Sequence, residues 1–217
     1  NWSYECSTGP ENWADNFPDC AGSSQSPIDF GAVAAGYVGT TSTNDPVSGV
    51  IDPAPSDFLV SIVNANTVYT CQSEGACGQL NFAGEVWNLV QFHFHGRLVI
   101  QTQMVALEFP GLLTPLCSAA VHSEHTVNGM AFPMELHMVH QIDLYNSSSV
   151  AVYSVMFDSA TGSASNTTAT EALDDLVFGL GQNNTAVNVD LSAFVPPTSG
   201  YYNYVGCVTL PMLSIEH

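Results

Sequence analysis

Short runs in which apolar and polar side chains alternate make up much of the chain. A period of two residues is typical of β-strands. Such runs predict strands at residues 57–63, 86–95, 134–142 and 150–157. Residues 31–56 and 158–170 are rich in Gly, Ser, Thr, Pro and Asp and are expected to form loops, while apolar residues at helical spacing predict a helix at 168–181. The pattern therefore indicates a mainly β protein.

Two of the expected strands carry histidines, because residues 91–95 read QFHFH and residues 135–140 read ELHMVH. Side chains alternate between strand faces, so His93 and His95 share one face, and a neighbouring strand can add His137. Three imidazoles with an open fourth position are typical of zinc sites, although cobalt or iron could occupy the same nitrogens. The alternative is that these are core histidines satisfied by protein hydrogen bonds. Two histidines at this spacing beside a third favour a metal.

The residues next to these histidines strengthen the metal hypothesis. By alternation Gln91 shares the face of His93 and His95, and Glu135 shares the face of His137. Histidines that bind a metal usually donate their second ring N–H to a carboxylate, amide or carbonyl oxygen. Gln91 and Glu135 are therefore the expected acceptors, one on each strand.

Segments from residue 2 to residue 211 follow, in order and spacing, those of a known enzyme family. They are residues 2–4, 9–13, 20–29, 91–95, 123–129, 133–137 and 204–211. On these segments the chain resembles the alpha-class carbonic anhydrases. The resemblance implies one domain over residues 1–217, with a large twisted, predominantly antiparallel sheet and short peripheral helices. It also implies the family's reaction, the reversible hydration of carbon dioxide to bicarbonate and a proton.

The resemblance also implies a role for each matching residue. His93, His95 and His137 correspond to the ligands of Zn²⁺, and Gln91 and Glu135 to the groups that hold those ligands.

The remaining matches surround the expected ligands. Thr209 corresponds to the residue that accepts a hydrogen bond from the zinc-bound hydroxide, and Glu124 to the carboxylate that orients this threonine. The expected lining of the substrate pocket consists of Val139, Val152, Val208 and Tyr4.

Three departures from the family pattern change the expectation. Thr67 stands where the family has its proton-shuttle histidine, so that shuttle is absent. An apolar insertion at about residues 97–121 is expected to pack on the domain or meet a partner. The sequence ends at His217, where family members continue, so we expect a sheet that is incomplete there. Self-association through residues 98–121 or through this C-terminal edge follows from both features.

Composition excludes some partners. Twenty acidic residues against one basic residue give a formal charge of −19, which argues against nucleic-acid binding. Polar residues or proline interrupt every apolar run, so no transmembrane helix is expected.

Cysteines and glycosylation sequons predict a secreted protein. Six cysteines without Cys-x-x-Cys spacing favour disulfides over a thiolate metal site. Cys71 and Cys77 enclose a short polar loop and form the safest pair. Secreted relatives pair the position of Cys20 with a cysteine near this end of the chain, which implies Cys20–Cys207 and leaves Cys6–Cys117. Asn-x-Ser/Thr sequons occur at Asn1, Asn146, Asn166 and Asn183.

Three functions remain open on the sequence. The complete set of ligands, with Glu124, Glu135 and Thr209, favours an extracellular zinc enzyme. The apolar insertion and the sequons are also compatible with a carbonic-anhydrase-like structural subunit of an extracellular assembly or fibre, with little activity. A metal-free binding module agrees least well with a complete ligand set.

Overall fold

The computed structural model describes residues 10–31, 56–63, 66–73, 75–82, 84–96, 122–142, 149–158, 167–177, 184–195 and 204–206. The helical elements in these residues are the 3-10 helices η1 (Pro10–Asp15), η2 (Pro18–Ala21) and η3 (Leu191–Phe194) and the α-helix α1 (Thr167–Val177). The strands are β1 (Ser56–Val63), β2 (Asn66–Cys71), β3 (Gln79–Phe82), β4 (Glu85–Gly96), β5 (Thr126–Val127), β6 (Met130–Ala131), β7 (Met134–Gln141), β8 (Val150–Phe157) and β9 (Ala186–Val189).

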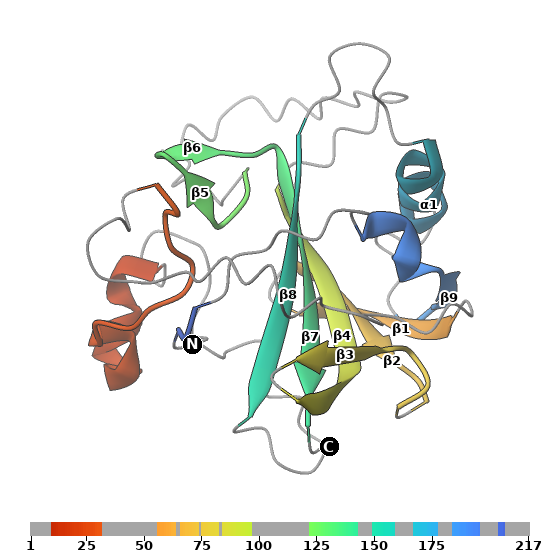
Figure 1. The fold of residues 1–217 in the computed structure, drawn as a ribbon, viewed down its shortest axis with the longest axis horizontal. Coiled ribbons are helices and arrows are strands. Elements are labelled where there is room, and N and C mark those ends of the chain that lie inside the picture. The colour runs from red at the N-terminus through yellow and green to blue at the C-terminus, as the bar shows by residue number, and fades with distance from the viewer. Residues whose placement is uncertain are drawn as a thin grey trace, which may run out of the picture.

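One large sheet dominates the described residues (Figure 1). Its strands run in the order β8-β7-β4-β2-β1-β9, and β3 pairs with β4 beside this path. Every strand pair of this sheet is antiparallel. The expected fold, a predominantly antiparallel sheet with short peripheral helices, is confirmed.

The alternating runs of the sequence correspond to the long strands β1, β4, β7 and β8, whose bounds differ from the expected ones by one residue at most. The shorter strands β2, β3 and β9 were not predicted. The helix α1 begins at Thr167, so the expected loop at 158–170 is wrong over its last four residues. Residues 178–181 of the expected helix, and 32–55 of the expected loop at 31–56, lie outside the described residues.

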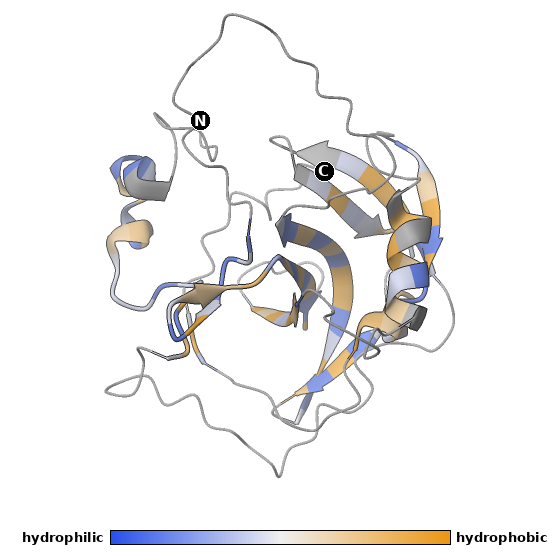
Figure 2. Cartoon of the chain, turned by 90° about the horizontal axis from the view of Figure 1, so that it is seen from above, coloured by the Kyte–Doolittle hydropathy of each residue, from blue (hydrophilic) through white to orange (hydrophobic). Residues whose placement is uncertain are grey.

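One face of the sheet forms the hydrophobic core, to which β4 contributes Phe92 and β7 contributes Leu136 and Met138, each with no exposed surface. The helices α1 and η3 belong to the same cluster. Figure 1 shows them together at one side of the sheet. Along the strands, hydrophobic and hydrophilic bands alternate (Figure 2). This alternation leaves the opposite face of β4 and β7 to buried polar side chains.

A short hairpin presents a segment that reaches the polar face. Asn128 and Gly129 have φ angles of 53° and 73°, a left-handed pair that suits a two-residue turn between β5 and β6. The Asp29 carboxylate accepts hydrogen bonds from the Gly129 amide at 3.0 and 3.1 Å. The hairpin is thereby tied to the N-terminal part of the chain, and residues 123–125 lead into it.

The cysteines agree with the sequence at one pair and differ at another. Cys71 and Cys77 form a disulfide that joins the end of β2 to the loop before β3. Cys20 is a free thiol, so the expected bond between Cys20 and Cys207 is wrong in this structure. The family pattern behind that expectation needs a cysteine at the position of Leu213, and Cys207 is six residues away from it.

Several expectations lie outside the described residues: the Cys6–Cys117 bond, the insertion at 97–121 and the sequons at Asn1, Asn146, Asn166 and Asn183. The single domain over residues 1–217 stays a prediction. Among the described helices, none combines the length and the apolar character that a membrane crossing requires.

Candidate metal centre

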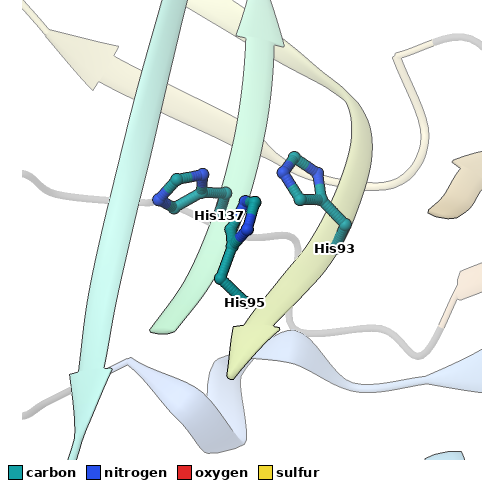
Figure 3. Close-up of side chains that lie close together, drawn as sticks. All are labelled: His93, His95 and His137. Carbon is teal, nitrogen blue, oxygen red and sulfur yellow. The ribbon is translucent and has the colours of Figure 1, made fainter. Parts of the chain in front are cut away.

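His93, His95 and His137 meet on the polar face of β4 and β7. His93 lies directly opposite His137 in the strand register, and the alternation of β4 puts His95 on the same face. Figure 3 shows the three rings close together beside β4 and β7. Their centroids are 4.6 to 5.3 Å apart, and one ligand nitrogen from each lies within 4.8 Å of the other two. The structure therefore brings the expected ligands together.

Two of the three histidines have one ring nitrogen held by a neighbour on the same strand. His93 Nδ1 lies 2.9 Å from Gln91 Oε1, and His137 Nε2 lies 2.9 Å from Glu135 Oε1. Each oxygen accepts a hydrogen bond from the imidazole N–H. The opposite nitrogens, Nε2 of His93 and Nδ1 of His137, then carry the lone pairs that a metal requires.

His95 has a buried nitrogen that no described residue satisfies. Its Nε2 lacks a hydrogen-bond partner, although the residue is only 6% exposed. A buried polar atom without a partner costs about 1–3 kcal/mol. A metal ion at the centre of the three rings would give this nitrogen a partner, so the residues present fit a zinc ion with three imidazole ligands.

Burial keeps these imidazoles in the form that binds metals. The pKa of His93 is lowered well below its ordinary value of 6.5, first by burial and then by the neighbouring His137 and His95. The pKa of His95 is lowered to about 3 by burial and by His137, against an opposing effect of Glu135. Both rings are therefore neutral at physiological pH, and ligation requires no proton to be removed from them.

Glu135 is the most enclosed carboxylate of the site, with no exposed surface. Burial by itself raises its pKa, but hydrogen bonds from His125 and His137 outweigh that effect and bring the pKa below its ordinary value of 4.5. Glu135 is therefore ionised and acts only as an acceptor. It also accepts the backbone N–H of His125 at 2.9 Å.

A hydrogen-bond chain behind Glu135 was not predicted. His125 Nδ1 donates to Glu135 Oε1, so in the neutral ring His125 Nε2 accepts from the Tyr204 hydroxyl at 2.6 Å. The Tyr204 oxygen is in turn hydrogen-bonded to Ser26 Oγ. These residues all lie in segments that resemble the family, yet none has an unusual sequence pattern. The sequence signal for His125 is its place immediately after Glu124.

His125, Glu135 and His137 also lie close enough together to hold a metal. Their facing atoms, however, already form the hydrogen bonds from His125 Nδ1 and His137 Nε2 to Glu135 Oε1. An ion there would have to replace both bonds. This group is therefore the support of the three-histidine centre and not a second one.

The remaining expected site residues are placed as follows. Val139 pairs directly with Val152 on the histidine face, and Val139 is 3% exposed. Thr67 is half-buried in β2 and precedes Val68, which pairs with His93. Strand alternation turns Thr67 away from the face of Val68. Thr209, Val208 and Tyr4 lie outside the described residues.

Comparison with known proteins agrees with this geometry. The family model of eukaryotic-type carbonic anhydrase matches residues 117–216. Carbonic anhydrase 1 of Monodelphis domestica is 29% identical over 227 residues, covering 98% of this chain and 76% of that protein. A carbonic anhydrase of Nostoc sp. is 28% identical over 220 residues, covering 99% of this chain and 69% of that protein.

Solved structures show the same fold. The alpha-carbonic anhydrase of Photobacterium profundum superposes with a TM-score of 0.63 at 24% identity, covering 97% of this chain and 79% of that one. The enzyme of Thermovibrio ammonificans gives 0.63 at 23% identity, covering 97% and 78%. The chain therefore shares the fold of these alpha-carbonic anhydrases, and over residues 117–216 its sequence matches the family model of eukaryotic-type carbonic anhydrase.

Proposed function

We propose that this chain catalyses the reversible hydration of carbon dioxide to bicarbonate and a proton, with a zinc ion held by His93, His95 and His137. The observation that carries the proposal is the convergence of three buried imidazoles around one point. The unsatisfied Nε2 of His95 agrees with it. The similarity to carbonic anhydrases supports the same reaction.

In this proposal one group of residues positions the metal ligands, and another forms the wall that the substrate contacts. When bound, zinc lowers the pKa of a water ligand to about 7 and so supplies hydroxide at neutral pH, an effect for which carbonic anhydrase is the reference case. Gln91 and Glu135 set the orientation of His93 and His137. A carbon dioxide molecule is apolar, and the buried Val139 beside Val152 offers it an apolar wall next to the ligands.

The resemblance assigns the alignment of the nucleophile to Thr209 and Glu124. Two variants of the full-length protein test the proposal. Thr209→Ala should lower the hydration rate without loss of zinc, because the resemblance makes Thr209 the residue that orients the nucleophile and not a ligand of the metal. His95→Ala should lose zinc and activity together. Stopped-flow hydration assays and metal analysis provide the readouts, and equal hydration rates in wild type and Thr209→Ala would contradict this role.

We infer an extracellular location for the enzyme. The Cys71–Cys77 disulfide supports it, because such bonds persist in oxidising compartments. The sequons at Asn1, Asn146, Asn166 and Asn183 support it as well. Glycosidase treatment of protein from its native source should reduce its mass, whereas an unchanged mass together with intracellular fractionation would contradict the inference.

We also propose that the chain associates with itself. Within the described residues β8 pairs on one side only, with β7, and residues 150–157 contain no charge and no proline to protect the other edge. The insertion at 98–121 is likewise too apolar to remain in water. Light scattering of the native protein should give a mass above that of one chain, and a stable monomer would contradict self-association.

A further inference from the structure

The third histidine of the centre, His95, has a carboxylate near its second ring nitrogen, and the resemblance gives that carboxylate a different role. His95 Nδ1 lies 3.4 Å from Glu124 Oε1. The other oxygen, Glu124 Oε2, lies 4.0 Å from His137 Nδ1. The Glu124 carboxylate therefore faces two of the three ligands. It does not belong to the group of mutually close ligand atoms, which consists of the three imidazoles.

The structure holds the backbone of Glu124 on both sides. Ser123 Oγ lies 2.6 Å from the His125 carbonyl oxygen, to which it donates, and it accepts the Phe132 N–H at 2.8 Å. On the other side, the His125 N–H donates to Glu135 Oε2 at 2.9 Å. The side chain of Glu124 is only 17% exposed. Its carboxylate is thus directed to the ligands by a fixed segment and is shielded from most of the solvent.

We propose that Glu124 is a positioning residue for the metal centre, which accepts the Nδ1–H of His95 and leaves Nε2 directed at the ion. Each ligand then has an acceptor of its own: Gln91 for His93, Glu124 for His95 and Glu135 for His137. A neutral imidazole has one N–H and one lone pair, so an acceptor at Nδ1 leaves the lone pair on Nε2. In His95 this Nε2 is buried and has no hydrogen-bond partner among the described residues.

This inference rests on the proposed metal centre but differs from the role that the resemblance gives to Glu124. If Glu124 acts only through Thr209, its loss changes the reaction and leaves metal affinity untouched. If it also holds His95, its loss weakens metal binding. Removal of such a partner typically costs 10–100-fold in metal affinity. The two readings therefore separate in a binding experiment that needs no substrate.

The experiment measures zinc affinity by competition with a chromophoric chelator, on metal-free full-length protein. Glu124→Ala should bind zinc about 10–100-fold more weakly than wild type. Glu124→Gln should bind nearly as well as wild type, because the amide oxygen still accepts the Nδ1–H. Thr209→Ala is the matched control and should keep wild-type affinity, while Gln91→Ala should lose about as much as Glu124→Ala. Equal affinities of wild type and Glu124→Ala would overturn the proposal.

A second measurement covers the case in which Glu124→Ala does not fold. In the metal-free wild-type protein, ¹⁵N spectra of labelled histidine should show His95 protonated at Nδ1 at neutral pH, and a ring protonated at Nε2 would overturn the proposal. Failure of the proposed function gives a different result, since wild type would then bind no zinc in the first experiment. The ¹⁵N result would still decide whether Glu124 holds His95.

Discussion

The two faces of β4 and β7 use the same backbone in opposite ways. On one face Phe92, Leu136 and Met138 are fully buried among apolar side chains. On the other, Gln91, Glu135 and the three histidines are buried as well, and their polar atoms need specific partners, which Gln91 Nε2 and His95 Nε2 lack among the described residues. An apolar face tolerates exchange of similar side chains, whereas the polar face depends on which atom donates and which accepts. The candidate metal centre therefore lies on the face whose buried hydrogen-bonding groups are harder to satisfy.

Two histidines of β7 show the same contrast within one strand. His137 belongs to the polar face and His140, three residues later, to the core face opposite Ala151 and Leu89. His140 has no exposed surface, its Nδ1 donates to the Met138 carbonyl oxygen at 2.9 Å, and its Nε2, like that of His95, has no hydrogen-bond partner among the described residues. Burial alone thus does not make a histidine a ligand. Convergence with other imidazoles does.

The largest change in zinc binding is expected when each of these two histidines is replaced by alanine in a separate variant. His137→Ala should abolish tight zinc binding and hydration activity, because only two ligands remain. His140→Ala should retain the metal and lose folding stability instead, since it leaves a cavity in the core. Zinc affinity and chemical denaturation of both variants provide the test. Comparable loss of zinc in both would remove the distinction between the two faces.

The second largest effect is expected on the core face, as a loss of folding stability. Phe92 stacks on Tyr69 with ring centroids 4.5 Å apart and meets Phe58 edge-on at 4.9 Å. Phe92→Ala should lower the free energy of unfolding by about 3–5 kcal/mol. Urea unfolding gives the value, and zinc content should stay that of wild type where the variant remains folded. A loss below about 1 kcal/mol would show that this face is not the core.

Acid should weaken the fold through His140. Burial lowers its pKa from 6.5 to about 4, against opposing hydrogen bonds to backbone oxygens. The unfolded chain therefore binds a proton at higher pH than the folded chain does, so stability falls as pH drops from about 6.5 toward about 4.

His140→Asn should reduce this slope over the same pH range. Urea unfolding of metal-free protein between pH 7 and pH 5 measures it, with His122→Asn as an exposed control. An unchanged slope in His140→Asn would show that His140 does not carry the dependence.

Most of the large strands could be predicted from the sequence, because alternation leaves a period of two in the side chains that lie along them. The short strands β2, β3 and β9 could not, since four to six residues show too little of that period and their pairing depends on neighbours far away in sequence. The cysteine pairing failed at Cys20 for a different reason, because the family pattern behind it needs a cysteine at the position of Leu213, where this chain has none.

In the candidate site, too, some features leave a local sequence pattern and others do not. The spacing of His93 and His95, with His137 on a second strand, sufficed to predict which three imidazoles converge and that Gln91 and Glu135 lie beside them as acceptors. The chain from His125 through Tyr204 to Ser26 includes a hydrogen bond between two residues that are 178 positions apart, Ser26 and Tyr204. Such a network is set by the fold and leaves no local pattern.

The smallest effect concerns proton transfer. Thr67 cannot titrate near neutral pH, so the proton released by hydration should leave through buffer molecules. Raising the concentration of an imidazole buffer should therefore increase the turnover, and more so than in a carbonic anhydrase that has the shuttle histidine. A turnover independent of buffer concentration would show that another group exports the proton.

The metal content of the native protein tests the central claim most directly. Elemental analysis of the purified chain should find about one zinc ion per chain, and the same analysis of His95→Ala should find it lost. A native protein without a bound transition metal, or a His95→Ala variant with undiminished zinc, would contradict the assignment of His93, His95 and His137 as the metal centre.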